Sequence, residues 1–174
     1  MANCRPNIPD FTSPECDFEA GRIVALAFIH KDIHAAIFAN PSNAALWIDG
    51  NYSADLHVFT EVRETLTASP VEVPGLGTQS SRIINAERTI ECSIEGVKNN
   101  ESFFDEIVKS HEYRVAAVIG SLYDMLFINN KDVSIWGTPN VEEGLDTQVL
   151  WAVTIKWFDV ANMKTSDVPA GIFN

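Results

Sequence analysis

Two stretches of strict two-residue alternation constrain the fold of this chain more than any other feature. In "ERTIECSIEGV" (87–97), Ile90, Cys92 and Ile94 alternate with glutamate, threonine and serine. In "LDTQVLWAVTIKWF" (145–158), valine, tryptophan and isoleucine recur at every second position through the second half. Successive side chains of a strand point to opposite faces, so each stretch predicts a strand with one buried and one polar face.

Weaker β-prone runs and one amphipathic segment complete the expected elements. Strands are expected in runs at 21–32, 56–67, 113–120, 123–129 and 131–137. The segment at about 100–110 predicts a helix, because Asn100 can cap it and Phe103, Phe104, Ile107 and Val108 form an apolar stripe.

The loops and ends set the expected domain boundaries. Ser42 or Asn43 can cap a short helix near 42–49, and the prolines and glycines of 68–81 predict the main loop. We expect an extended N-terminal arm (1–20), a single β-rich domain (21–160) and an irregular tail (161–174). The predicted class is therefore mainly β: a β-sandwich or barrel with one flanking helix.

Composition narrows the classes of function. The 174 residues carry a net charge of −12 and no basic stripe, which argues against tight binding of DNA or RNA. The three cysteines include no CxxC pair, which disfavours a disulfide framework or a zinc site. No apolar run approaches the roughly 18–20 residues of a membrane span. The start lacks the apolar region of a signal peptide, so synthesis in the cytoplasm is expected.

A search for catalytic and metal-binding patterns yields weak candidates. His30, Asp32 and His34 would share a face of a continuous strand, and His57 could join them from a neighbour, but the sequence shows no pattern of hydrogen-bonding partners that would orient these side chains as metal ligands. Cys92 is better explained as core filler than as a nucleophile paired with a histidine. We therefore expect no enzymatic activity, no cofactor and no metal.

The order of elements resembles that of a known class of virion proteins. From residue 87 a strand, a short amphipathic helix, three strands and a long final strand follow one another, and "ERTIECSIEGVKNNESFFDEIVKSHEYRVAAVIGS" carries most of the likeness. This order resembles the tail-tube and related ring-forming proteins of tailed bacteriophages. The start "CRPNIPDFTSPEC" and the ending "LWAVTIKWFDVANMKTSDVPAGIF" also resemble small virion proteins of phages that infect Bacteroidota-type hosts.

The resemblance implies a repeated structural subunit without catalytic residues, located in the virion. Its partners would be further copies of itself and other virion proteins. Loops and terminal arms would then contact neighbouring subunits. The residues expected at such contacts are Arg5, Phe11, Phe18, Val73, Leu76, Ile172 and Phe173.

The glutamates of the 87–97 strand suggest a further role within such a ring. Glu87, Glu91 and Glu95 share one strand face, which could line a lumen and repel DNA so that it passes without sticking. No sequence-specific nucleic-acid binding is expected.

Two alternatives remain open. The first is a capsid-decorating or baseplate-type virion protein built on a similar sandwich. The second is a β-sandwich module that binds a carbohydrate or protein ligand through its loops and tryptophans. Trp47, Trp136, Trp151 and Trp157 are the candidates for such a platform, although core packing explains them more simply.

Overall fold

The computed structural model describes residues 23–52, 55–75, 81–95, 97, 100–120, 125–140 and 149–173. The elements follow in the order β1 (Ile23–His30), α1 (Lys31–Ala39), α2 (Ala44–Tyr52), β2 (Leu56–Val73), β3 (Arg82–Ile94), α3 (Glu101–Lys109), β4 (Tyr113–Ile119), β5 (Met125–Ile128), β6 (Ser134–Asn140), β7 (Leu150–Phe158) and β8 (Lys164–Ser166). The protein is mainly β, as the alternation predicts, and it has two antiparallel sheets.

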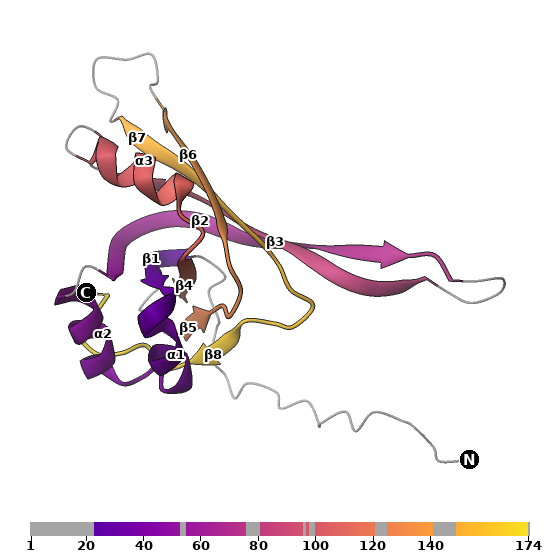
Figure 1. Cartoon of the computed structure of the whole chain (residues 1–174), viewed down its shortest axis with the longest axis horizontal. Helices are drawn as coiled ribbons and strands as arrows, with labels where there is room; N and C mark the ends of the chain where they lie inside the picture. Colours follow the sequence, from indigo (N-terminus) through magenta and orange to yellow (C-terminus); the bar gives the residue numbers. More distant parts are fainter. Residues whose placement is uncertain are drawn as a thin grey trace.

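Hydrogen bonds connect the strands in the order β6-β7-β3-β2-β1-β4-β5-β8, and β2 belongs to both sheets (Figure 1). Sheet A contains the first part of β2 with β1, β4, β5 and β8. Sheet B contains β6, β7, β3 and the second part of β2. The second half of β2 and the first half of β3 extend away from the body as a long hairpin (Figure 1).

An irregularity in β2 marks the point at which it passes from one sheet to the other. Ala25 of β1 pairs with Thr60 and Ile23 with Glu64, so two steps along β1 correspond to four along β2. Leu56, before this point, is buried beside the helices, whereas Val62 within it is buried between the sheets. The buried face of β2 therefore changes at this irregularity, as does that of β1, where Ile23 lies between the sheets and Ala25 on the helix side.

Two hydrophobic cores lie on opposite faces of sheet A. The first fills the space between the sheets and beneath α3, where alternate residues of β3 and β7 meet those of β1 and β4. Ile90 pairs with Ile155 and Cys92 with Val153 across the buried face of sheet B. The second core lies between sheet A and the helices α1 and α2. The predicted sandwich is thus confirmed, with helices on its outer side as well (Figure 1).

The central strand β1 is buried on both faces, which explains its nearly unbroken apolar sequence. Leu26 and Phe28 face the first core, whereas Ala25, Ala27 and Ile29 face the second. A strand covered on both sides is expected to read as a continuous hydrophobic run instead of an alternating one. The small alanines leave room for the helices above them.

The helix α3 is fixed to sheet B by stacked aromatic rings. Phe104 stacks on Trp151 with ring centroids 4.4 Å apart and planes 17° from parallel. The indole of Trp151 lies over Gly137 of β6, where an added Cβ would come within 2.1 Å of Nε1. The helix therefore depends on the absence of a side chain at Gly137.

The predicted elements hold in most places, and the exceptions lie at the end of β1, in the expected 68–81 loop and in the tail. The helices expected at about 100–110 and near 42–49 are present as α3 and α2. The run expected to be a strand over 21–32 ends at His30, and a full helix, α1, follows it at once. Residues 68–73, expected to be loop, continue β2. Pro70 is tolerated there because, in the described part, this portion of β2 pairs with β3 on one side only.

The predictions for the N-terminal arm stay untested, whereas the C-terminal tail differs from expectation. Residues 1–20, with Arg5, Phe11 and Phe18, and the loop residue Leu76 lie outside the described residues. In the tail, residues 164–166 form β8 and pair with β5. The prediction that Phe173 is available to a neighbouring subunit is wrong, because it is fully buried and packs edge-on against Trp47 of α2 at 5.3 Å.

We predict that Gly137→Ala destabilises the protein by about 1–3 kcal/mol, because the new methyl group overpacks Trp151. The melting temperature should fall by roughly 2–4 °C for each kcal/mol in a domain of this size. Thermal unfolding followed by circular dichroism measures this change. Combined with Gly137→Ala, the change Trp151→Leu should lower the free energy of unfolding by less than the sum of the two single changes. Thr138→Ala, at the next position, is the control. A fully stable Gly137→Ala protein would contradict the packing described here.

Candidate functional site

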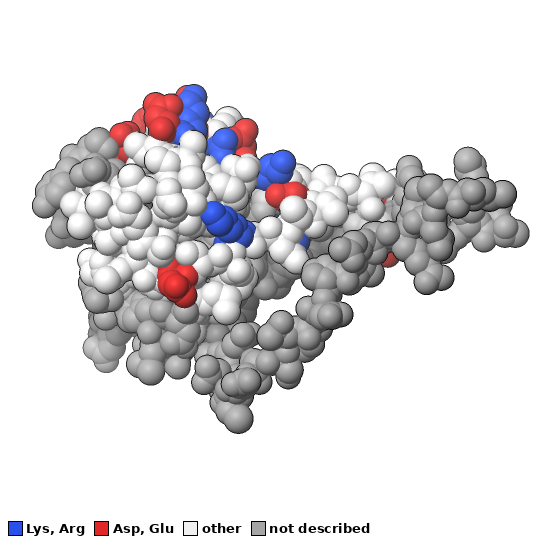
Figure 2. Space-filling model, turned by 90° about the horizontal axis from the view of Figure 1, so that it is seen from below, with Lys and Arg blue, Asp and Glu red and all other residues white. Residues whose placement is uncertain are grey.

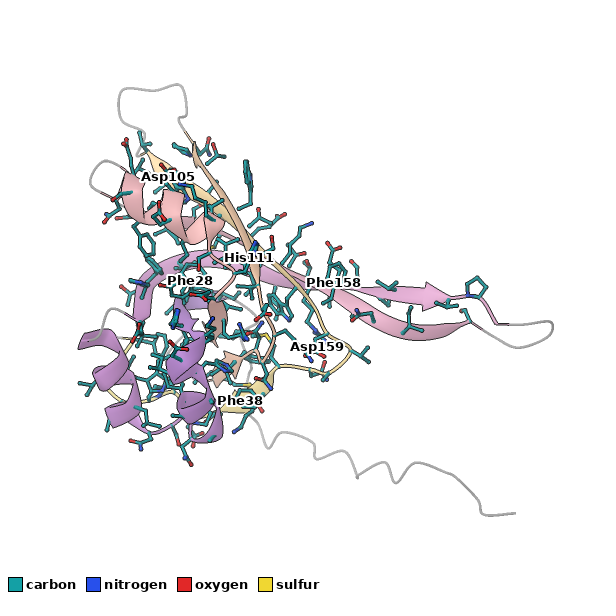
Figure 3. The ribbon with its side chains drawn as sticks, in the orientation of Figure 1. Phe28, Phe38, Asp105, His111, Phe158 and Asp159 are labelled. Carbon is teal, nitrogen blue, oxygen red and sulfur yellow. The ribbon has the colours of Figure 1, made fainter. Side chains whose placement is uncertain are left out.

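The most distinctive cluster of polar and aromatic side chains lines a cavity of about 440 Å³ beside α3. It is assembled from the end of β1, the start of β2, the helix α3 and the start of β4. The lining residues are His30, His57, Ser102, Phe103, Glu106, Ile107, Ser110, Glu112 and Tyr113. A second hollow of about 250 Å³ adjoins it and shares His57 and Phe103. In Figure 3, Asp105 lies on α3 and His111 lies in the connection from α3 to β4.

His30 joins the cavity to the first turn of α1. Its Nδ1 accepts a hydrogen bond from the backbone N–H of Asp32 at 3.4 Å, so His30 is the N-cap of the helix. This leaves Nε2 to carry the proton and donate to Glu112 Oε2 at 3.2 Å. The cap explains why the chain changes from strand to helix at this residue.

Glu112 is held from two directions. Its Oε1 accepts from the Lys31 ammonium while Oε2 accepts from His30. The hydrogen bond and charge of Lys31 hold the pKa of Glu112 below its usual value, and Glu112 in turn raises the pKa of Lys31. Both side chains are about half exposed, so the pair orients the carboxylate more than it stabilises the fold.

A chain of contacting rings forms the wall of the cavity. His30 packs edge-on against Tyr113 at 5.4 Å, and His57 contacts Tyr113 at 5.9 Å. His57 also packs against Phe103 at 4.7 Å. Phe103 contacts Phe104, which leads to the stack on Trp151. The wall is therefore continuous with the core that holds α3.

Burial changes the acid–base properties of two of these rings. Desolvation lowers the pKa of His57, opposed in part by the negative charge of Asp55. Desolvation also raises the pKa of Tyr113, and the charges of Asp55 and Glu112 add to this rise. Around neutral pH His57 is therefore an uncharged imidazole and Tyr113 an uncharged phenol.

The structure separates the histidines that a continuous strand would have aligned. His34 lies one turn into α1 and is buried on the other side of sheet A, where its Nε2 donates to the Asn129 carbonyl oxygen at 2.7 Å. Its ring stacks on Phe38, and burial lowers its pKa. Of the predicted group, His30 and His57 both line the cavity, and the Asp32 carboxylate lies 3.4 Å from Nδ1 of His30. Among the described residues, no group of three or more His, Cys, Asp or Glu side chains is placed to hold a metal ion.

The other predicted residues lie in separate places. Cys92 is buried between the sheets, and His111 is exposed in the connection before β4. Three tryptophans are core residues, as expected, whereas Trp136 on β6 is 65 % exposed. Val73 lies on the projecting hairpin and is 38 % exposed.

Glu87 and Glu91 of the glutamate stripe lie on the outer face of sheet B, whereas Glu95 follows the end of β3 and lines the hollow beside α3. Glu91 and Glu95 are exposed, whereas Glu87 is partly buried and forms an ion pair with Lys156 of β7 at 3.0 Å. Elsewhere too the charges are mixed: on the view in Figure 2, Lys and Arg side chains lie beside Asp and Glu side chains along the upper edge. The stripe is therefore less negative at Glu87 than the sequence pattern implies.

The sequence offered little signal for the cavity itself. His57 was suggested by its place on a strand next to His30, but Tyr113, Glu112 and Phe103 come from segments far apart in the chain. No spacing rule relates residues that only the register of β1 with β2 and β4 brings together. Of the lining residues, Phe103 and Ile107 are expected from the sequence to be apolar and inward-facing, as part of the helical stripe.

Comparison with known proteins adds no relative: no family model, no curated protein and no solved structure matches the chain. Among the described helices, none is long and apolar enough to cross a membrane.

We predict that the folded protein loses stability as the pH falls below about 6.5, the ordinary pKa of histidine. His34 and His57 have lowered pKa values in the folded state, so the unfolded chain binds more protons in this range and stability rises with pH. Each histidine can contribute a slope of at most about 1.4 kcal/mol per pH unit.

Denaturant unfolding at pH 7.5, 6.5 and 5.5 measures this slope. His34→Gln and His57→Gln should each flatten it, whereas His111→Gln, at an exposed position, should leave it unchanged. Equal slopes in all four proteins would show that His34 and His57 do not cause the pH dependence of stability.

Proposed function

We propose that this chain is a non-enzymatic structural subunit of a phage virion that self-assembles into a ring or tube, as a tail-tube-like or tail/neck ring component. Its partners are further copies of itself and other virion proteins, and it resides in the virion. The observation that carries the proposal is that two edges of sheet B pair with no further strand in the described part of the chain.

The first edge is β6, a strand of 7 residues that pairs only with β7 among the described elements. Its sequence "SIWGTPN" contains no charged residue, and it exposes Trp136. Charges are the usual protection of a free strand edge against pairing with another chain. An uncharged edge with an exposed tryptophan is therefore suited to association.

The second edge is the part of β2 beyond its pairing with β1. Residues 65–73 pair with β3 on one side, and no described strand covers the other. If β6 of one copy pairs with this edge of the next, the four strands of sheet B continue from copy to copy. Such a contact is head to tail, and a head-to-tail contact closes into a ring when the rotation per copy allows it.

The projecting hairpin supplies apolar surface for the same contact. Val71, Val73, Ile83 and Ile84 are each 38–55 % exposed on this arm. Figure 1 shows the arm leaving the body of the subunit. Exposed apolar side chains gathered on one projection are typical of an interaction surface.

One observation favours the alternative of a carbohydrate-binding module. Trp136 and Phe158 are 65 % and 54 % exposed. Both side chains belong to the polar outer face of sheet B, because Trp136 pairs with Thr154 and Phe158 follows Lys156 at the next outward position. Two exposed aromatic rings on a polar sheet face could stack on sugar rings. A glycan screen of the monomer tests this alternative.

The double variant Ile83→Lys/Ile84→Lys should abolish or strongly reduce self-assembly, because it places two charges on the apolar arm. Multi-angle light scattering with negative-stain images should show rings, tubes or a defined multimer for the wild type and a monomer for the variant. Ile48→Lys is the matched control, since Ile48 is also exposed (44 %) but lies on α2, away from the arm. A wild-type protein that is monomeric at every concentration would count against the ring, and an assembling double variant would count against the arm.

Replacing Glu87, Glu91 and Glu95 with glutamine should preserve assembly and increase retention of DNA, if these residues face the lumen. The expected cause is the loss of repulsion between the carboxylates and the phosphate backbone. Co-sedimentation of short duplex DNA with assembled particles, at low and high salt, measures retention. Failure of the variant to assemble would instead place the glutamates at a contact between subunits.

A further inference from the structure

The cavity beside α3 has the chemistry of a site for an organic cation. Four of its lining side chains are rings, namely His30, His57, Phe103 and Tyr113, and two are the carboxylates Glu106 and Glu112. The described lining residues include no lysine or arginine, although Lys31 pairs with Glu112 and Lys109 with Glu106 from outside the lining. Aromatic faces and carboxylates both attract cations, and a volume of about 440 Å³ is within the usual range for ligand sites.

The charges around the cavity are predominantly negative. The negative charge of Asp55 raises the pKa of both His57 and Tyr113. The charges of Glu112, Asp32 and Asp132 raise the pKa of Lys31. Glu95 lines the adjoining hollow. A positively charged occupant is therefore favoured by the surroundings as well as by the lining.

The two carboxylates are accessible for such an occupant. Glu106 and Glu112 have side chains 78 % and 52 % exposed, and their present partners, Lys109 and Lys31, are also exposed. Exposed ion pairs of this kind contribute little and exchange partners readily. The planar guanidinium of arginine suits the site better than the ammonium of lysine, because it can stack on a ring while it donates to a carboxylate.

We propose that this cavity binds an arginine side chain of a partner polypeptide. The proposal does not depend on ring assembly, because the cavity lies between α3 and the ends of β1, β2 and β4, whereas the assembly surfaces are β6 and the hairpin. The sequence's net charge of −12 makes a basic partner segment electrostatically complementary.

The test uses N-acetyl-arginine amide as the probe and N-acetyl-citrulline amide, its uncharged near-isostere, as the control. Proton NMR at pH 7.5 follows the Cε1 protons of the histidines during titration. The signals of His30 and His57 should shift and saturate with the arginine probe only. His34 provides an internal control, because it is buried on the other face of sheet A.

Two variants test the named groups. Glu112→Gln and Phe103→Leu should each weaken binding by about fivefold or more, the factor that corresponds to about 1 kcal/mol for one cation–π or exposed charge contact. Glu91→Gln, which removes a carboxylate from the outer face of sheet B, should leave affinity within about twofold. Circular dichroism confirms that each variant is folded.

Each possible result of these titrations either supports or overturns the proposed arginine site. Saturable shifts that need the positive charge and are weakened by both variants support the site. No saturable shift, equal shifts with citrulline, or an equal loss in Glu91→Gln would overturn it. None of these results depends on whether the wild type forms rings.

Discussion

The fold depends on one strand, β2, that serves two sheets. Between Thr60 and Glu64 it gains two residues relative to β1, and this irregularity turns its buried face from the helix side of sheet A to the space between the sheets. Without it, the alternation of β2 would continue in register and Val62 would point away from the inter-sheet core. The same turn directs the far half of β2 away from β1. It thereby leaves residues 65–73 paired on one side only among the described strands, and the hairpin projects from the body (Figure 1).

Sequence predicts this protein best where burial is one-sided. β3 and β7 were predicted from strict alternation because each packs one face on the core and leaves the other polar. Prediction from the sequence fails for strands that are buried on both faces and for strands that lie outside the core. In the apolar run around β1, only Lys31 and Asp32 indicate a turn, and the helix α1 that follows is also rich in apolar residues, so hydrophobicity does not mark the end of the strand. The hairpin was missed because Pro70 normally argues against a strand, and only knowledge of its single pairing partner explains why proline is accepted there.

The candidate cavity illustrates a different limit. Its residues are individually ordinary in the sequence, and the site arises from the register that sets the end of β1 beside the starts of β2 and β4. Its wall is also continuous with the packing of α3, since Phe103 lines the cavity and the adjacent Phe104 stacks on Trp151. The helix introduced by Asn100 therefore does more than cover the open end of a sandwich. It holds one wall of the cavity in a fixed place, and Gly137 makes that attachment sterically feasible.

Charge relates the two proposals to each other. A subunit with a net charge of −12 repels its own copies, so any self-association must use surfaces where charge is sparse. The strand β6 has no charged residue, and the only charged residue within 65–73 of β2 is Glu72. Backbone pairing between such edges gains hydrogen bonds without bringing carboxylates together. The acidic, ring-lined cavity has the opposite character and is suited to a basic partner instead of another copy. The distribution of charge over the chain thus favours like partners at the edges of sheet B and an unlike partner beside α3.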